Sequence, residues 1–492
     1  MGLFVDIKNA DTPASPVTAD ENNAMMIGKS SVIPDTNPFL AADIAKLTSI
    51  LIPTTSQLYK GAQNYFSHVN GNAGLWCYAI GDDSATTSTQ IMLQGARDGS
   101  NDTLYAPYSP VYEITGVEFN YSGLGWYLET GAEYVASAAS GNIVFATGLK
   151  FSGYGIDASG FFPTPNDYVR ATVSYGGLGE AYNSMLRDDI YFQAFTFAYN
   201  QELTQPEGVG TTKYAADQCY GSTGWLDDIK IGKTMAANFY NVGRSYPMYI
   251  TNIPDGLLPN SIMTGYTAGT SYDASPGAYR YSQIRDIVGQ TKFVSVATTK
   301  QATDGEDTAA SFMGEIMSTK PRLPIATMTS TLAQATFPLD DETLGWKSAH
   351  INPLLKYAGN IIWYSGKTLA TGYEAEINYN RCLGIMKKRL KDDILTRIMK
   401  RDLKYSSSGV NSLVNTIKGT LKRLQGENII DGGSITVNVP ILDYLNRESS
   451  LNTADKAYLT AQRQSQLVKD ITIKFPWAGD ILFVEISSIL PN

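Results

Sequence analysis

The residues IIWYSGKTL at 361–369 and INYNR at 377–381 decide the fold of this chain. The first run is apolar at its start and closes on Gly366, the pattern of a buried strand that ends in a turn. The second run opens a segment, about 376–404, in which apolar residues recur every three or four positions along one face. Together the two runs predict a strand that is followed by a long helix.

The sequence after this helix predicts an α+β domain. A second helix with apolar residues at helical spacing is predicted to end at Gly426, and strands are predicted at 435–439, 468–475 and 481–486. The last of these strands is apolar on both faces at its start, so it needs a cover on both sides. We therefore expect a C-terminal domain over 346–492 that ends in a strand arm from about 476.

The sequence before residue 346 shows a different pattern. Residues 1–8 alternate as a strand would, and a Thr-, Ala-, Pro- and Asp-rich stretch follows, so residues 1–20 are predicted as a strand arm with a linker. Short apolar strand patterns and helical patterns then alternate. Buried strands are expected at 24–28, 75–80, 246–253 and 292–297, and helices at 39–50, 56–66 and 306–318.

The stretch from about 101 to 225 is rich in Tyr, Gly, Ser and Thr and poor in Lys and Arg, which indicates a β-rich insertion. The predicted fold class is therefore α+β and multidomain: an α/β core over 21–100 and 226–345, the inserted β-rich domain over 101–225, and the C-terminal α+β domain.

Composition excludes several classes of function. Charged residues make up only 17% of the chain, and there are 31 tyrosines, which suits a surface that becomes covered by other subunits. The net charge of −9 argues against direct binding to nucleic acid. Neither a signal peptide nor an apolar run of membrane-spanning length is visible, so membrane insertion is not expected.

Motifs for catalysis or cofactor binding are not recognisable either. The two histidines, His68 and His350, lie in no metal-ligand spacing, and the sequences GKS at 28–30 and GKT at 232–234 lack the first glycine of a phosphate loop. We therefore expect no enzyme, no catalytic residues, no cofactor and no metal. The cysteines Cys77, Cys219 and Cys382 are far apart and are expected to be buried free thiols.

Charge is divided unevenly along the chain. Residues 346–492 carry 20 Lys and Arg against 13 Asp and Glu, a net charge of +7, whereas the rest carries −16. Much of the positive charge lies on the two long predicted helices. Such a distribution either orients the docking of an acidic partner or reflects only the lysines on the solvent-exposed faces of long helices.

The C-terminal third resembles the contractile tail sheath family, which includes sheaths of phages, of phage-tail-like bacteriocins and of related injection systems. The likeness lies in INP at 351–353, in IIWYSGKTL at 361–369 and in the arginine-bearing helix start INYNR. Residues AMMIG at 24–28, with the later Asn37-Pro38 turn, resemble the first strand and loop of that family. The chain departs from the pattern at Lys367, where the family also has Arg, and the insertion is unmatched.

The resemblance implies a structural subunit. Sheaths of this family form stacked hexameric rings around an inner tube, and their terminal strands pair with neighbouring subunits. The arms would here be Leu3, Val5 and Ile7 at one end and Leu482, Val484 and Ile486 at the other. The basic C-terminal domain would face an acidic tube, with the predicted contacts Lys387, Lys388, Lys391, Lys418, Lys422 and Arg423.

The same resemblance implies the partners and the location of the protein. The partners would be further copies of the chain, the inner tube protein, and the baseplate and tail terminator proteins. The particle would assemble in the host cytoplasm, and the protein would end in the tail of the virion. The sheath would contract from a metastable extended state, with genome delivery as the outcome in a phage.

Two other readings stay open on the sequence. One is a self-assembling surface protein or adhesin whose Tyr-rich β domain binds glycans. The other is an enzyme, such as a hydrolase with carboxylate chemistry in residues 100–225.

Overall fold

The structure is a computed structural model, and it describes most of the chain outside the two ends and parts of the middle. The described residues are 20–69, 73–81, 87–93, 103–105, 111–120, 125–128, 134–137, 142–145, 168–175, 177–187, 190–198, 225–243, 245–252, 284–285, 288–298, 307–321, 323–326, 328–332, 349–357, 359–400, 403–466 and 468–477. The strands predicted in the two arms, at 1–8 and 481–486, lie outside these ranges.

A mixed eight-stranded sheet forms the centre of the molecule, in the order β15-β14-β13-β12-β11-β1-β3-β2. Its strands are β1 (Ala24–Lys29), β2 (Phe39–Ala41), β3 (Leu75–Ile80), β11 (Ala194–Phe197), β12 (Met248–Asn252), β13 (Val294–Thr298), β14 (Ile351–Tyr357) and β15 (Asn360–Trp363). The six inner strands are parallel, and the edge strands β2 and β15 run antiparallel to their neighbours.

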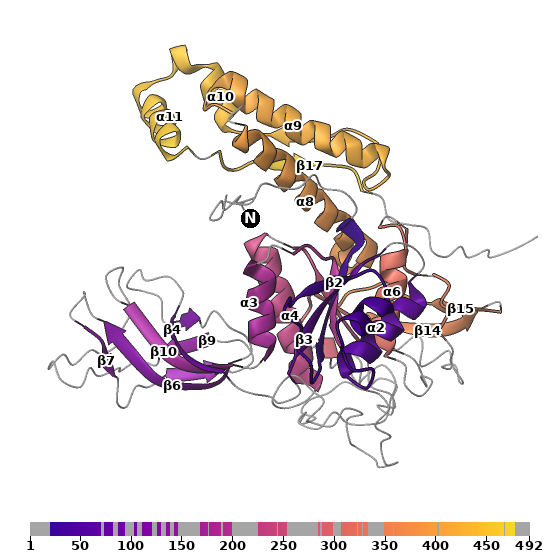
Figure 1. The fold of residues 1–492 in the computed structure, drawn as a ribbon. Helices are drawn as coiled ribbons and strands as arrows, with labels where there is room; N and C mark the ends of the chain where they lie inside the picture. Colours follow the sequence, from indigo (N-terminus) through magenta and orange to yellow (C-terminus); the bar gives the residue numbers. More distant parts are fainter. Residues whose placement is uncertain are drawn as a thin grey trace, which may run out of the picture.

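Helices cover both faces of this sheet, which is why its strands are apolar without alternation. In β1, Met25 and Ile27 belong to the core on one side, and Ala24 and Met26 to the core on the other. Figure 1 shows α3 (Gly177–Arg187) and α4 (Trp225–Val242) on one side, and α2 (Gln57–His68) and α6 (Thr308–Ser318) on the other. The buried strands expected at 24–28 and 75–80 are confirmed.

The expected helix at 39–50 is wrong in its first half. Residues 39–41 form the edge strand β2, and the helix α1 (Ile44–Ser49) begins only after Asp43, whose carboxylate accepts from the Lys46 amide at 3.2 Å. The spacing of apolar residues does not distinguish the strand from the helix, because Phe39 of β2 and Leu47 of α1 are buried in the same core. The N-cap at Asp43 marks the boundary that the periodicity missed.

Parts of the range 101–225, together with residues 87–92, form two small sheets. One has the order β4-β10-β6-β7 and the other β5-β9-β8. Their strands are β4 (Thr87–Met92), β5 (Thr103–Tyr105), β6 (Val111–Asn120), β7 (Tyr127–Leu128), β8 (Tyr134–Ser137), β9 (Asn142–Phe145) and β10 (Tyr168–Tyr175). Figure 1 shows most of these strands projecting away from the main sheet.

The main sheet also takes strands from outside the range predicted for the α/β core. Strand β11 falls within the predicted insertion but pairs with β1 and β12, and β14 and β15 fall within the predicted C-terminal domain but form a sheet edge. The order of strands in a sheet is set by packing and not by their order in the sequence. A change in local composition along the chain therefore does not show which strands join the main sheet.

Residues 377–477 form a separate group of elements, which we call the C-terminal unit; it lies at the top of Figure 1. It comprises α8 (Ile377–Met399), α9 (Ser407–Gly426), β16 (Thr436–Asn438), α10 (Ile441–Asn446), the 3-10 turn η3 (Glu448–Ser450), α11 (Thr453–Ser465) and β17 (Thr472–Lys474). Two more 3-10 turns, η1 (Asp20–Asn22) and η2 (Gly372–Ala375), lie elsewhere. The two long predicted helices are confirmed, and Leu390, Ile394, Ile417 and Leu421 form their shared core.

None of the helices in the described part of the chain is both long and apolar enough to cross a membrane. Cys77 and Cys382 are buried free thiols, as predicted, and Cys219 lies outside the described residues. Burial raises the pKa of the Cys77 thiol, so it stays protonated.

Candidate assembly site

The motif residues of 351–381 come together where helix α8 meets the main sheet. Asn352 is fully buried, and its amide nitrogen donates to the Ser295 hydroxyl at 3.0 Å and to the Lys367 carbonyl at 2.9 Å. The Lys367 amide in turn donates to the Asn352 Oδ1 at 2.7 Å. One buried amide therefore joins β13, β14 and the strand-to-helix segment, which explains why an Asn rather than an apolar residue stands here.

Trp363, opposite Leu354 in the same hairpin, fixes the neighbouring part of this segment. Its indole is fully buried against Phe312, with ring centroids 4.3 Å apart, and its Nε1 donates to Glu315 Oε2 at 2.5 Å. The other carboxylate oxygen accepts from the Ser330 hydroxyl at 2.9 Å and from the Thr331 amide at 2.8 Å. A buried carboxylate needs this number of donors, so the cluster is a structural anchor.

Both histidines have structural partners. His68 Nδ1 lies 2.6 Å from the Thr331 hydroxyl and 3.6 Å from Glu315, at the edge of the Trp363 anchor. His350 Nδ1 donates to the Thr368 carbonyl at 3.2 Å, and burial, with the charge of Arg285 second, lowers the pKa of His350. Among the described residues, three or more His, Cys, Asp or Glu side chains nowhere gather closely enough to hold a metal ion.

Helix α8 starts on a tight connection from the strand. A Cβ on Gly366 would lie 2.8 Å from the Ala326 backbone nitrogen, so only glycine fits there. The Ile377 amide donates to the Gly366 carbonyl at 2.9 Å, and Lys367 forms an ion pair with Glu376, the residue that caps α8. Lys367 therefore serves the start of α8.

Arg381, the arginine of the helix start, is fully buried and contacts the main sheet. Its Nε donates to Gln193 Oε1 at 3.0 Å. Burial without a carboxylate partner lowers the pKa of the guanidinium to about 10. The arginine thus ties α8 to Gln193, the residue just before β11. Its place in the sequence motif did not reveal this role.

Three of the six predicted tube-facing residues lie at contacts within the chain. Lys387 donates to the Tyr240 hydroxyl, with its Nζ 3.7 Å from that ring's centroid, and burial lowers its pKa. Lys391 donates to the Gly243 carbonyl at 3.0 Å, where α4 ends and its dipole is negative. Lys388 pairs with Asp392 at 2.8 Å.

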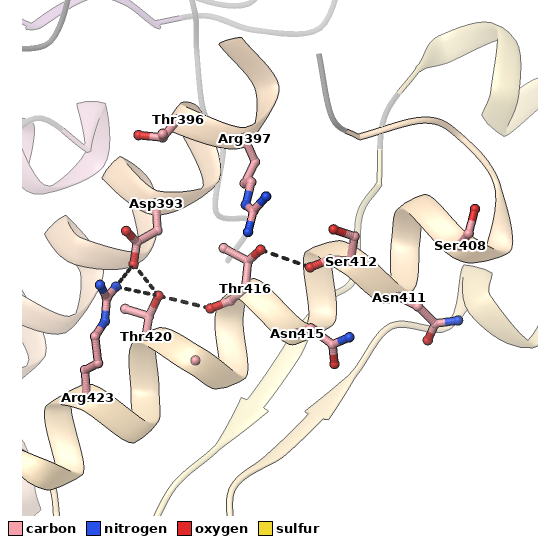
Figure 2. Close-up of a pocket in the computed structure, with 11 residues that line it drawn as sticks. Asp393, Thr396, Arg397, Ser408, Asn411, Ser412, Asn415, Thr416, Thr420 and Arg423 are labelled. Atoms are coloured by element: carbon pink, nitrogen blue, oxygen red, sulfur yellow. Dashed lines mark hydrogen bonds and ion pairs between the residues drawn. The ribbon is translucent and has the colours of Figure 1, made fainter. Parts of the chain in front are cut away.

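The other three predicted residues lie on the outer face of α9. Lys418 and Lys422 are exposed, and Arg423 is exposed while forming an ion pair with Asp393 of α8. Beside them, a groove of about 830 Å³ runs between α8 and α9. Figure 2 shows its polar lining, in which Thr420 and Arg423 both reach Asp393 and Thr416 bonds back to Ser412.

Strands β16 and β17 form a small sheet that pairs with no other strand in the described part of the chain. Val437 and Ile473 lie opposite each other and are half-buried against the helix hairpin, whereas the flanking Thr436, Asn438 and Lys474 are exposed. Within the described residues, each strand thus has one edge on which no further strand pairs. This sheet is the candidate acceptor for added strands.

Comparison with solved structures finds similar chains at low sequence identity. No family model matches the chain, and no curated protein sequence matches it. A sheath tail protein from Desulfitobacterium hafniense has 11% identity and a TM-score of 0.42, over 88% of this chain and 93% of that one. The contracted sheath of the extracellular contractile injection system PVC has 10% identity and a TM-score of 0.49, over 99% and 96%.

A chain of the anti-feeding prophage baseplate has 9% identity and a TM-score of 0.48, over 99% of this chain and 98% of that one. The solved structures named here are thus a sheath tail protein, a contracted sheath of an injection system and a chain of a baseplate assembly.

Proposed function

We propose that this chain is the structural subunit of a contractile tail sheath, which polymerises as stacked hexameric rings around an inner tube. The order of the motifs at 351–381 supports the family, and in the structure the motif residues Asn352, Gly366 and Arg381 help to seat α8 on the main sheet. The observation that carries the proposal is the β16–β17 sheet with its two open edges.

An open edge of this kind accepts a strand from another chain. The added strand satisfies the free N–H and C=O groups and places alternate side chains against the half-buried apolar face. The segments Leu3–Ile7 and Leu482–Ile486 have the alternating or apolar pattern that this requires. In the proposed assembly they pair with the sheets of neighbouring subunits and link the sheath into a mesh.

Such a mesh contracts without a nucleotide. The extended lattice is metastable, and the energy released on contraction comes from the additional surface buried between subunits. The strand links hold the subunits together while these rotate and slide. Baseplate and terminator proteins would bind the two ends of the sheath, which assembles in the host cytoplasm and acts as part of the virion tail.

The tube contact is proposed for the exposed face of α9. Reversing Lys418 and Lys422 to glutamate should leave the fold intact because both side chains are exposed, and should weaken binding to the inner tube protein at low salt by about tenfold or more. Cosedimentation with purified tube measures this. The control reverses Lys456 and Lys469, which are also exposed in the C-terminal unit. Equal binding by both double variants would remove α9 from the tube contact.

Electron microscopy of the concentrated, purified chain is the direct test of the proposed function. A sheath subunit should polymerise alone into hollow, striated tubes because the contracted lattice is its state of lowest free energy. The images also give the symmetry of the rings. Discrete particles of uniform size at high concentration would contradict the proposal.

The adhesin alternative receives less support from the small sheets. Trp126, an aromatic residue near their surface, has the guanidinium of Arg170 over its ring at 4.0 Å, and Arg170 also pairs with Glu118 at 2.5 Å. The cation therefore covers a ring face on which a sugar would stack. A glycan array with the purified chain separates the two functions.

A further inference from the structure

Two segments that adjoin the strands predicted for the terminal arms both contact helix α8. The turn η1 (Asp20–Asn22) lies at the end of the predicted N-terminal arm and linker, and Trp477 lies at the start of the predicted C-terminal arm, ahead of its strand at 481–486. We call η1 the N-terminal root and residues 475–477 the C-terminal root. Each root contacts α8 through a different side chain.

Arg389 of α8 holds the N-terminal root. Its Nε and Nη2 donate to the two carboxylate oxygens of Glu21 at 2.6 and 2.7 Å, and its Nη1 donates to Glu427, the residue after α9, at 2.6 Å. A guanidinium that grips a carboxylate with two nitrogens sets orientation as well as distance. From Asn23 onward the chain bonds to the main sheet, since the Asn23 carbonyl accepts from the Gln193 amide at 2.9 Å.

Tyr379, in the first turn of α8, holds the C-terminal root. The ring of Trp477 stands edge-on to the Tyr379 ring, with centroids 4.9 Å apart and an interplanar angle of 76°. Phe475 and Trp477 also pack against the core that α8 shares with α9. The chain therefore leaves the C-terminal unit from the start of α8.

Helix α8 is itself firmly tied to the main sheet. The Ile377 amide, the buried Arg381 and Lys391 bond to the Gly366 carbonyl, to Gln193 and to the Gly243 carbonyl respectively. Tyr379 and Arg389 are ten residues apart, which is about 15 Å along a helix axis. The two roots are thus held at a set separation on one rigid element.

We infer that Arg389 and Tyr379 are positioning residues that mount both terminal arms on α8, so that a pull on one arm reaches the other through this helix. The inference rests on the proposed strand exchange. Without Arg389, the three residues of η1 would join the linker and add about 10 Å to its reach. A longer and less directed tether lowers the effective concentration of the arm at its neighbour's sheet.

The test compares Arg389→Gln and Tyr379→Leu with matched controls in the same unit. Arg463 grips Glu448 with two nitrogens at 2.5 and 2.7 Å, and Tyr444 pairs with Tyr458 at 5.2 Å between centroids, so the controls are Arg463→Gln and Tyr444→Leu. The root variants should raise the critical concentration for tube formation, and the controls should leave it at the value of the parent chain.

A second measurement reads the N-terminal root in the monomer. Spin labels at Asp20→Cys and Lys418→Cys, in a Cys219→Ser background, should give a narrow distance distribution in the parent chain. Arg389→Gln should broaden it, and so should Glu21→Ala, which removes the same contact without altering α8. Arg463→Gln should leave it narrow. The circular dichroism spectrum and the urea midpoint confirm that each variant folds.

The outcomes separate the inference from the proposed function. If the parent chain forms tubes and the root variants do so at the same concentration, the mounting role is overturned and the sheath stands. If the parent chain forms no tubes, the proposed function fails. In that case an unchanged distance distribution in Arg389→Gln also overturns the anchoring of the root.

Discussion

A chain that lacks residues 1–8 should fold normally and fail to build long tubes. The three apolar side chains Leu3, Val5 and Ile7 would each contribute about 1.5–3 kcal/mol when buried on a neighbouring sheet. Even after the cost of ordering the strand, their loss should raise the critical concentration for polymerisation about a hundredfold or more. Sedimentation and electron microscopy measure this concentration directly.

The matched control keeps the length of the segment and changes only which face is apolar. Substituting Leu3, Val5 and Ile7 by serine should reproduce the deletion, whereas substituting Phe4, Asp6 and Lys8 by serine should not, because successive side chains of a strand face opposite sides. Equal effects of the two triple variants would contradict strand pairing. Tubes of normal length from the deletion would exclude any role of the segment.

Replacing Trp363 by alanine should cause the largest loss of stability of any single substitution discussed here. The side chain is fully buried, and its removal leaves a cavity beside Phe312, which costs about 3–5 kcal/mol. The buried Glu315 carboxylate also loses the indole N–H that donates to it at 2.5 Å. Urea unfolding followed by circular dichroism measures the change in the free energy of unfolding.

Two further variants separate packing from hydrogen bonding at this site. Trp363→Phe keeps most of the volume but removes the donor, so it should lose about 1–3 kcal/mol. Tyr357→Ala, on the exposed tip of the same hairpin, should change stability by less than about 0.5 kcal/mol. If Trp363→Ala were no more harmful than Tyr357→Ala, the Glu315 cluster would not be an anchor of the fold.

The features that local pattern predicted correctly are those with a strong period or a long apolar run. The periodic spacing of apolar residues predicted helices α8 and α9. The apolar runs at 24–28 and 75–80 predicted strands β1 and β3 of the central sheet. These elements bury apolar side chains in a regular order, so the order of residues carries the information. The helix expected at 39–50 failed because its spacing fits a strand and a short helix that share one core.

The basic side chains show what local pattern cannot decide. Lys387 and Lys418 stand on the polar faces of neighbouring helices, and both have the sequence context of a solvated or partner-facing lysine. In the fold the first lies against Tyr240 and the second is exposed. The difference depends on whether α4, which comes more than a hundred residues earlier, packs beside that part of the helix.

The sequence by itself determined the long helices, the buried strands and the motif order that resembles a sheath. Only the tertiary structure decided that β11 and β14 share one sheet, that Asn352, Glu315 and Arg381 are structural anchors, and that both roots meet on α8. The first group follows from contacts between residues close in the chain. The second depends on hydrogen bonds, ion pairs and ring contacts between segments far apart, whose partners no local pattern specifies.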